Sequence, residues 1–105
     1  MDFSKMKDMA LSVREDYSRL ELKKYGQNWG RQDIMLGFVG DVGDLAKLVI
    51  AQEGRRDIAD FEKKTAHELA DCLWSIIVLA DSYHIDLEES FSDLCAKLRQ
   101  RIGTG

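Results

Sequence analysis

Apolar residues recur at alternating spacings of three and four along most of the chain, which is the repeat of an α-helix with one apolar face. The clearest example covers residues 3–25 and ends at Gly26, a residue type that commonly follows the last turn of a helix. Its apolar positions are Phe3, Met6, Ala10, Val13, Tyr17 and Leu20. The pattern therefore predicts a long first helix with one face turned toward the interior.

Similar apolar stripes predict three further helices, and two aspartates stand where N-cap residues are expected. Asp57 precedes the longest stripe, and Asp86 precedes the last one, with Glu89 three residues later as in a capping box. No long segment alternates with the period of two that marks a half-buried strand, and proline is absent. We therefore predict one all-α domain over residues 1–105, a four-helix bundle whose later helices cover about residues 32–53, 57–83 and 86–102.

The composition suits a folded protein that does not bind nucleic acid. Apolar residues make up 45% of the chain, enough for a core, and the formal net charge of −4 argues against a protein that binds phosphate backbones. The longest apolar run, residues 72–80, is too short to cross a bilayer, and the charged N-terminal segment lacks an apolar signal core. Cys72 and Cys95 form no disulfide or zinc pattern. These features predict a cytoplasmic protein without membrane or nucleic-acid partners.

The chain is short for the length of its apolar stripes. A protein of 105 residues buries only a modest fraction of its surface when it folds alone. Long helices with one apolar face then gain from contact with a second copy of the chain. We therefore expect a homo-oligomer, at least a dimer.

Two pairs of carboxylates stand at the edges of neighbouring apolar stripes. Asp41 and Asp44 lie one turn apart in the second predicted helix, and Glu68 and Asp71 lie one turn apart in the third. Two antiparallel helices packed by these stripes would bring all four together, and a divalent cation would offset their repulsion. A site of oxygen ligands without Cys or His suits magnesium or manganese. Acidic pairs at this spacing are also common on solvated helix surfaces, so a purely structural role for them stays open.

The residues beside these pairs have further unusual features. Gly37, Gly40 and Gly43 repeat every three residues, although each costs roughly 1 kcal/mol relative to alanine inside a helix. Either close helix packing or the close approach of a ligand would compensate for that cost. His67 adjoins Glu68, but we expect it on the surface, away from the acidic side of its helix.

At these residues the sequence resembles the MazG-like nucleoside triphosphate pyrophosphohydrolases, an all-α family. Its members carry a first motif such as G-E-V-G-E-L-A, typical of the dCTP-pyrophosphatase-like branch, and a downstream E-L-x-D. The corresponding segments here are Gly40-Asp41-Val42-Gly43-Asp44-Leu45-Ala46 and Glu68-Leu69-Ala70-Asp71. Trp29 resembles the family's G-W element, and residues 85–87 resemble the turn before its last helix. The resemblance covers roughly residues 17–100.

The resemblance implies magnesium-dependent hydrolysis of a nucleoside or deoxynucleoside triphosphate to the monophosphate and pyrophosphate, as a house-cleaning activity on nucleotide pools. The implied magnesium ligands, which are also the catalytic residues, are Asp41, Asp44, Glu68 and Asp71. Trp29 either stacks on the nucleobase or caps the core, and Lys64 and Lys47 either contact phosphates or are simply solvated. Members of the family assemble as dimers or dimers of dimers, in agreement with the expected homo-oligomer.

One departure from the family pattern keeps other functions open. Both acids of the first motif are aspartates where the family usually has glutamates, which withdraws each carboxylate by roughly 1.5 Å. The chain is then an active pyrophosphohydrolase, a degenerate domain that binds nucleotide or metal without turnover, or a structural bundle that dimerises by its apolar faces.

Overall fold

The computed structural model describes residues 1–54 and 56–103, and within these ranges the chain forms four α-helices and no strand. The helices are α1 (Phe3–Tyr25), α2 (Arg31–Glu53), α3 (Phe61–Ser82) and α4 (Leu87–Gly103). The predicted all-α class and the four helices are therefore confirmed. None of these helices contains an apolar stretch long enough to span a bilayer.

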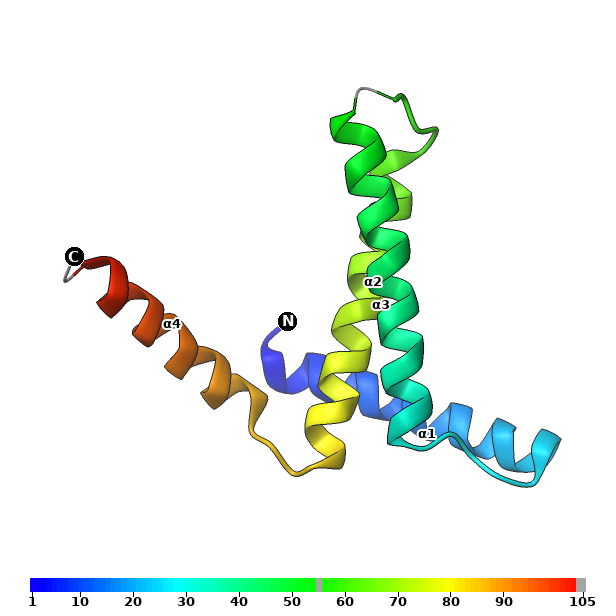
Figure 1. Cartoon of the computed structure of the whole chain (residues 1–105). Helices are drawn as coiled ribbons and strands as arrows, with labels where there is room; N and C mark the ends of the chain where they lie inside the picture. The colour runs from blue at the N-terminus through cyan, green and yellow to red at the C-terminus, as the bar shows by residue number, and fades with distance from the viewer. Residues whose placement is uncertain (55, 104–105) are drawn as a thin grey trace.

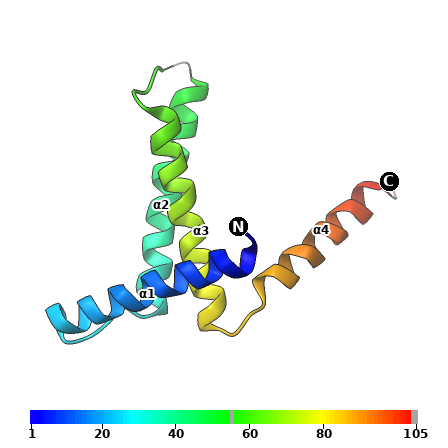
Figure 2. The same ribbon diagram turned by 180° about the vertical axis from the view of Figure 1, so that it is seen from behind.

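Helices α2 and α3 form a long antiparallel hairpin, and α1 crosses α3 near the end of the hairpin that lies away from its connecting loop (Figure 1). Figure 2 shows the same crossing from behind, with α1 lying over the hairpin. The indole nitrogen of Trp74 donates a hydrogen bond of 3.1 Å to the carbonyl of Ala10, which attaches α1 to α3. The side chain of Arg31 donates to the Ser82 hydroxyl at 3.1 Å and so joins the start of α2 to the end of α3. These contacts fix the three helices relative to one another at this end.

Several helix ends follow directly from the sequence. Gly26 ends α1 in the left-handed region with φ 75°, a conformation that glycine adopts without a steric penalty. Asp33 accepts a hydrogen bond of 2.9 Å from the Gly30 amide at the start of α2. Asp86 caps α4 by accepting from the Glu89 amide at 3.0 Å, as the capping-box pattern predicts.

The predicted start of α3 is wrong by about one turn. The helix begins at Phe61 with Asp60 as its N-cap, and Asp60 has a φ of 57°, so the helix cannot continue upstream through it. Asp57 therefore does not cap α3 and lies in the connection. The helical spacing of Ile58 suggested an earlier start, but Ile58 lines a hollow beside Lys64 instead. Hydrophobic spacing alone does not reveal a left-handed residue that interrupts it.

The core of the single chain is thin. Its buried apolar residues are Ala10, Ile34, Cys72, Ile77 and Val78, and among the described residues no large side chain is completely enclosed. The radius of gyration is 16.9 Å, whereas a compact chain of this length has about 13 Å. Helix α4 points away from the hairpin, and only the first part of α4 lies near α3 (Figure 1). The chain is therefore extended, with apolar helix faces that no other part of it covers.

The apolar stripe predicted for α1 is only partly inward-facing. Its first half lies against α3, and Ala10 is buried, but Val13, Tyr17 and Leu20 are all exposed. The buried residue in the second half of α1 is Glu21, with 5% of its surface exposed. The inner face of α1 therefore changes from apolar to charged along its length, because it meets the loop before α2 there rather than another helix.

Candidate functional site

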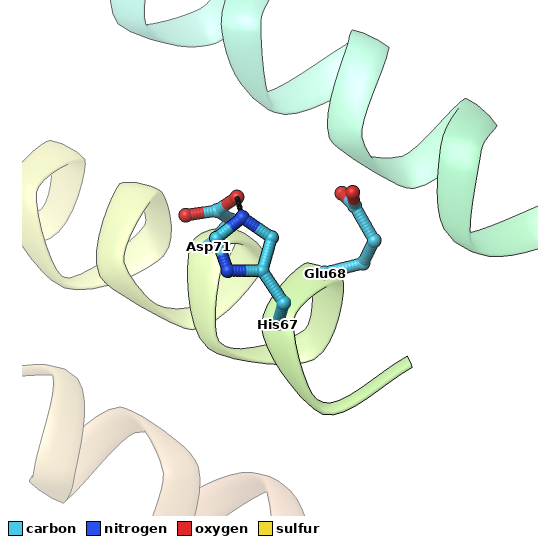
Figure 3. A group of neighbouring side chains, drawn as sticks. All are labelled: His67, Glu68 and Asp71. Carbon is cyan, nitrogen blue, oxygen red and sulfur yellow. Dashed lines mark ion pairs between the residues drawn. The ribbon is translucent and has the colours of Figure 1, made fainter. Parts of the chain in front are cut away.

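The hairpin brings the four predicted acidic residues together from two facing helices. Asp41 and Asp44 come from α2, and oxygen atoms of these two residues and of Glu68 on α3 all lie within 4.8 Å of one another. Asp71 belongs to a second, overlapping group with Glu68 and His67 that meets the same limit. In Figure 3 the carboxylates of Glu68 and Asp71 both point from α3 toward the neighbouring helix. The antiparallel packing of α2 and α3 thus produces the arrangement that their spacing in sequence predicts.

The electrostatic state of this acidic cluster, defined as Asp41, Asp44, Glu68 and Asp71, favours a cation. Burial and then repulsion by Asp71 and Asp44 raise the pKa of Asp41 above its usual value. Burial and then the three other carboxylates of the cluster raise the pKa of Glu68. One oxygen of Glu68, Oε2, is buried and has no hydrogen-bond partner among the described residues. A divalent cation that prefers oxygen ligands would provide a partner for this buried acceptor and offset the repulsion around it. These acidic groups could therefore hold such a metal.

His67 contacts the cluster, so the expectation that it lies away from the acidic side of its helix is wrong. Its side chain is 73% exposed, as expected for a surface residue, but its Nε2 lies 3.1 Å from Oδ2 of Asp71 (Figure 3). The ring reaches Asp71 because residues four apart are neighbours on a helix. The spacing of four between His67 and Asp71 is the signal from which the contact could have been predicted. His67 lowers the pKa of Asp41 and of Glu68 when it is charged, against the larger effects that raise them.

A pocket of about 560 Å³ adjoins one side of the acidic cluster, where α1 and the loop before α2 meet the hairpin. Asp41 and Asp71 contribute one wall. Three aromatic residues, Tyr17, Trp29 and Trp74, contribute to the remaining walls. This aromatic pocket contains the predicted Trp29, whereas Tyr17 and Trp74 are additional. Trp74 follows the second motif by three residues, and this helical spacing is the only signal for it in the sequence.

A second hollow of about 370 Å³ adjoins the other two acids, toward the loop that connects α2 and α3. It is lined by Asp44, Lys47, Leu48, Ile58, Lys64 and Glu68. The two lysines predicted to contact phosphates therefore lie together, one from each helix of the hairpin. The acidic cluster separates this lysine hollow from the aromatic pocket.

The glycines of α2 are not explained by packing inside the chain. Among the described residues, and apart from the nearby backbone of α2 itself, a Cβ atom added at Gly37, Gly40 or Gly43 would meet no atom within 4 Å. Close helix packing is one of the two reasons expected for these glycines, and within the described part of the single chain that reason is wrong. Gly37 lines the aromatic pocket, so space for a bound molecule remains as a reason at that position.

The sequence model of the MazG nucleotide pyrophosphohydrolase domain matches residues 31–104, which include all four acids and both lysines. The chain belongs to this family. No match was found among the curated proteins or among the solved structures. Membership of the MazG family indicates nucleotide pyrophosphohydrolase activity at the level of the family. Helix α1 and Trp29 lie before the matched segment. The part of the aromatic pocket that they line is therefore not covered by the family model.

Proposed function

We propose that the protein hydrolyses a nucleoside or deoxynucleoside triphosphate to the monophosphate and pyrophosphate with magnesium, or manganese, at Asp41, Asp44, Glu68 and Asp71. The observation that carries this proposal is the order of three features along the hairpin: the aromatic pocket, the acidic cluster and the lysine hollow. A nucleoside triphosphate has the matching order of an aromatic base, metal-binding phosphates and a strongly anionic end. A role in clearing surplus or non-standard nucleotides agrees with this chemistry.

The proposed substrate lies with its base among the aromatic residues. Trp29 and Trp74 offer flat apolar faces on which a base can stack, and Tyr17 adds a third. The phosphates then extend past Asp41 and Asp71 toward Lys47 and Lys64, whose ammonium groups would bind the departing pyrophosphate. The lysines also offset part of the negative charge that the acids and phosphates bring together.

The acids of the cluster have two tasks in this proposal. A bound divalent ion would neutralise the phosphates and lower the pKa of a coordinated water. The four carboxylates would hold that ion, and one that is not fully engaged by it would accept the proton of the attacking water.

The degenerate, non-catalytic alternative rests on the aspartates of the first motif. Their short side chains would separate the ligands if the helices kept the spacing that glutamates require. Oxygen atoms of Asp41 and Asp44 nevertheless lie within 4.8 Å of one of Glu68, so the shorter side chains are still close enough to share one cation with it. An active enzyme and an inactive metal-binding domain both require this proximity, so the release of pyrophosphate is what distinguishes them.

We also propose a homodimer or a dimer of dimers. The single chain exposes 8474 Å², about 2,500 Å² more than a compact protein of its mass is expected to expose. An excess of that size matches the surface that stable homodimer interfaces cover, and much of it is apolar, as at Leu36, Ile50 and Ile102. Light scattering should give a mass of at least twice 12.0 kDa, and a monomer at micromolar concentration would contradict the proposal.

Further parts of the proposal rest on the sequence. Cys72 and Cys95 are unpaired, which agrees with a cytoplasmic location. The net charge of −4 agrees with a protein that binds no nucleic acid, and we propose no membrane partner. Placement in the dCTP-pyrophosphatase-like branch rests on the first motif alone.

Pyrophosphate release from a panel of ribonucleoside and deoxyribonucleoside triphosphates, with magnesium, manganese or a chelator, tests the proposal. An active enzyme releases pyrophosphate only with metal, and Asp44→Asn or Glu68→Gln abolishes the release. A binding domain shows nucleotide or metal binding by calorimetry but no release. A structural bundle shows neither, which would refute both functions.

A further inference from the structure

The most buried charged side chain of the described residues lies outside the acidic cluster, on α1. Glu21 has 5% of its surface exposed, and burying a carboxylate is costly unless it is paired and hydrogen-bonded. Its Oε1 accepts a hydrogen bond of 2.7 Å from the backbone amide of Trp29. The same oxygen lies 3.4 Å from Nη1 of Arg14, two helical turns earlier on α1. The partners of Glu21 therefore include one residue of its own helix and the loop before α2.

Arg14 completes this contact on the other side of the same residue. Its Nη2 donates to the carbonyl of Trp29, so the amide and the carbonyl of one loop residue are both held from α1. The Arg14 side chain is only 15% exposed, and its charge is paired with Glu21. We call these three residues, Arg14, Glu21 and Trp29, the loop clamp.

The loop clamp forms part of the wall of the aromatic pocket. All three of its residues line that pocket together with Asp41 and Asp71. Trp29 is 57% exposed and belongs to no helix. It lies in the loop that runs back from the end of α1 to the base of the hairpin (Figure 1). The position of its indole therefore depends on its backbone, and the clamp holds that backbone.

We propose that Glu21 and Arg14 are positioning residues that fix Trp29 as the wall against which the substrate's base binds. This inference rests on the proposed function, because it assumes that the aromatic pocket takes a nucleoside. The clamp acts through Trp29 and not on the phosphates, so its loss weakens substrate binding more than it slows turnover of bound substrate. Arg14 and Glu21 lie on α1 and Trp29 lies in the following loop, all before the segment that matches the MazG family model.

Hydrogen exchange at the Trp29 amide tests the clamp directly. The sequence has two tryptophans, so protein labelled with ¹⁵N-tryptophan gives two backbone amide signals, and that of Trp74 inside α3 is the internal reference. Glu21→Ala removes the acceptor and should speed exchange at Trp29 roughly tenfold or more, without changing Trp74. Glu21→Gln retains an acceptor oxygen and should keep most of the protection. The matched control, Glu15→Gln, removes a charge from the exposed side of α1, where Glu15 pairs with Arg19, and should change neither signal.

Steady-state kinetics of the same full-length variants provides the second measurement. Glu21→Ala should raise KM roughly tenfold while kcat changes less than threefold, and Glu21→Gln should restore KM most of the way. Arg14→Lys serves if Glu21→Ala does not fold, because a single ammonium cannot reach both Glu21 and the Trp29 carbonyl. Arg14→Lys should also raise KM, as expected for Glu21→Ala.

An unchanged exchange rate at Trp29 in Glu21→Ala would overturn the clamp, and so would an unchanged KM in Arg14→Lys if Glu21→Ala does not fold. Faster exchange with an unchanged KM would overturn its role in substrate binding. If the parent protein turns over no nucleotide, the proposed function fails by itself, and the exchange rate still decides whether the clamp holds the loop.

Discussion

Neutralising Asp41 should have opposite effects on activity and on the stability of the metal-free protein. Asp41→Asn keeps the shape of the side chain but removes one charge from the acidic cluster. The proposed metal then loses an anionic ligand, so pyrophosphate release should fall by at least a hundredfold. The metal-free fold should become more stable, because Asp41 no longer repels the acids beside it.

The size of the stability gain follows from the geometry. Asp41, Asp44 and Glu68 have oxygen atoms within 4.8 Å of one another, so Asp41 has two like-charged neighbours at that limit. At such a separation two like charges repel by about 1 kcal/mol in a water-like dielectric, which suits a partly exposed site. Loss of both repulsions should stabilise the metal-free protein by about 1–2 kcal/mol. For a domain of this size the melting temperature should then rise by roughly 4 °C or more.

Thermal unfolding with a chelator and with magnesium measures this effect. Magnesium at a hundred times its dissociation constant should stabilise the parent by about 2.7 kcal/mol, and the variant much less. Asp8→Asn, which removes a charge from the exposed surface of α1, is the control and should respond to magnesium like the parent. A variant that is less stable than the parent in chelator, with a parent that does not respond to magnesium, would show that Asp41 is a structural residue and refute the reasoning.

Three further predictions test other parts of the site. Lys64→Gln and Lys47→Gln should each raise KM for the triphosphate several-fold at low salt and leave the fold intact, and unchanged kinetics in both would remove the lysine hollow from the substrate site. Because the pKa of Asp41 and of Glu68 is raised, the native protein binds protons more tightly than the unfolded chain does. Thermal unfolding in chelator should therefore show that the free energy of unfolding rises as the pH falls from neutral toward those raised values. A free energy of unfolding that falls over the same pH range would contradict the repulsion among the acids. Gly37→Ala should stabilise the metal-free protein by about 1 kcal/mol and raise KM, whereas a lower stability would indicate that a second chain packs at Gly37.

The sequence predicted the parts of this structure that depend on local preferences. The four helices, the end of α1 at Gly26 and the cap at Asp86 all follow from residue spacing and residue type. The start of α3 was missed, because the left-handed conformation of Asp60 comes from the path of the connection.

The site was predictable only where its residues repeat on one helix. The spacing of three within the pairs Asp41/Asp44 and Glu68/Asp71 predicts that each pair lies on one side of its helix. The antiparallel packing of α2 and α3 then brings the two pairs together. Glu21 gave no such signal. Its burial depends on the loop at Trp29 folding back onto α1, a contact that no periodic pattern in the chain encodes.

The central claim is that a divalent ion lies among the four acids with a nucleotide between the aromatic pocket and the lysine hollow. A crystal of the protein with manganese and a non-hydrolysable triphosphate analogue tests it through the anomalous signal of the metal. The account predicts a peak about 2.0–2.5 Å from carboxylate oxygens of Asp41, Asp44, Glu68 and Asp71, with the base beside Trp29 and the terminal phosphate toward Lys47 and Lys64. A peak elsewhere, or well-ordered acids that point apart with no metal between them, would contradict it.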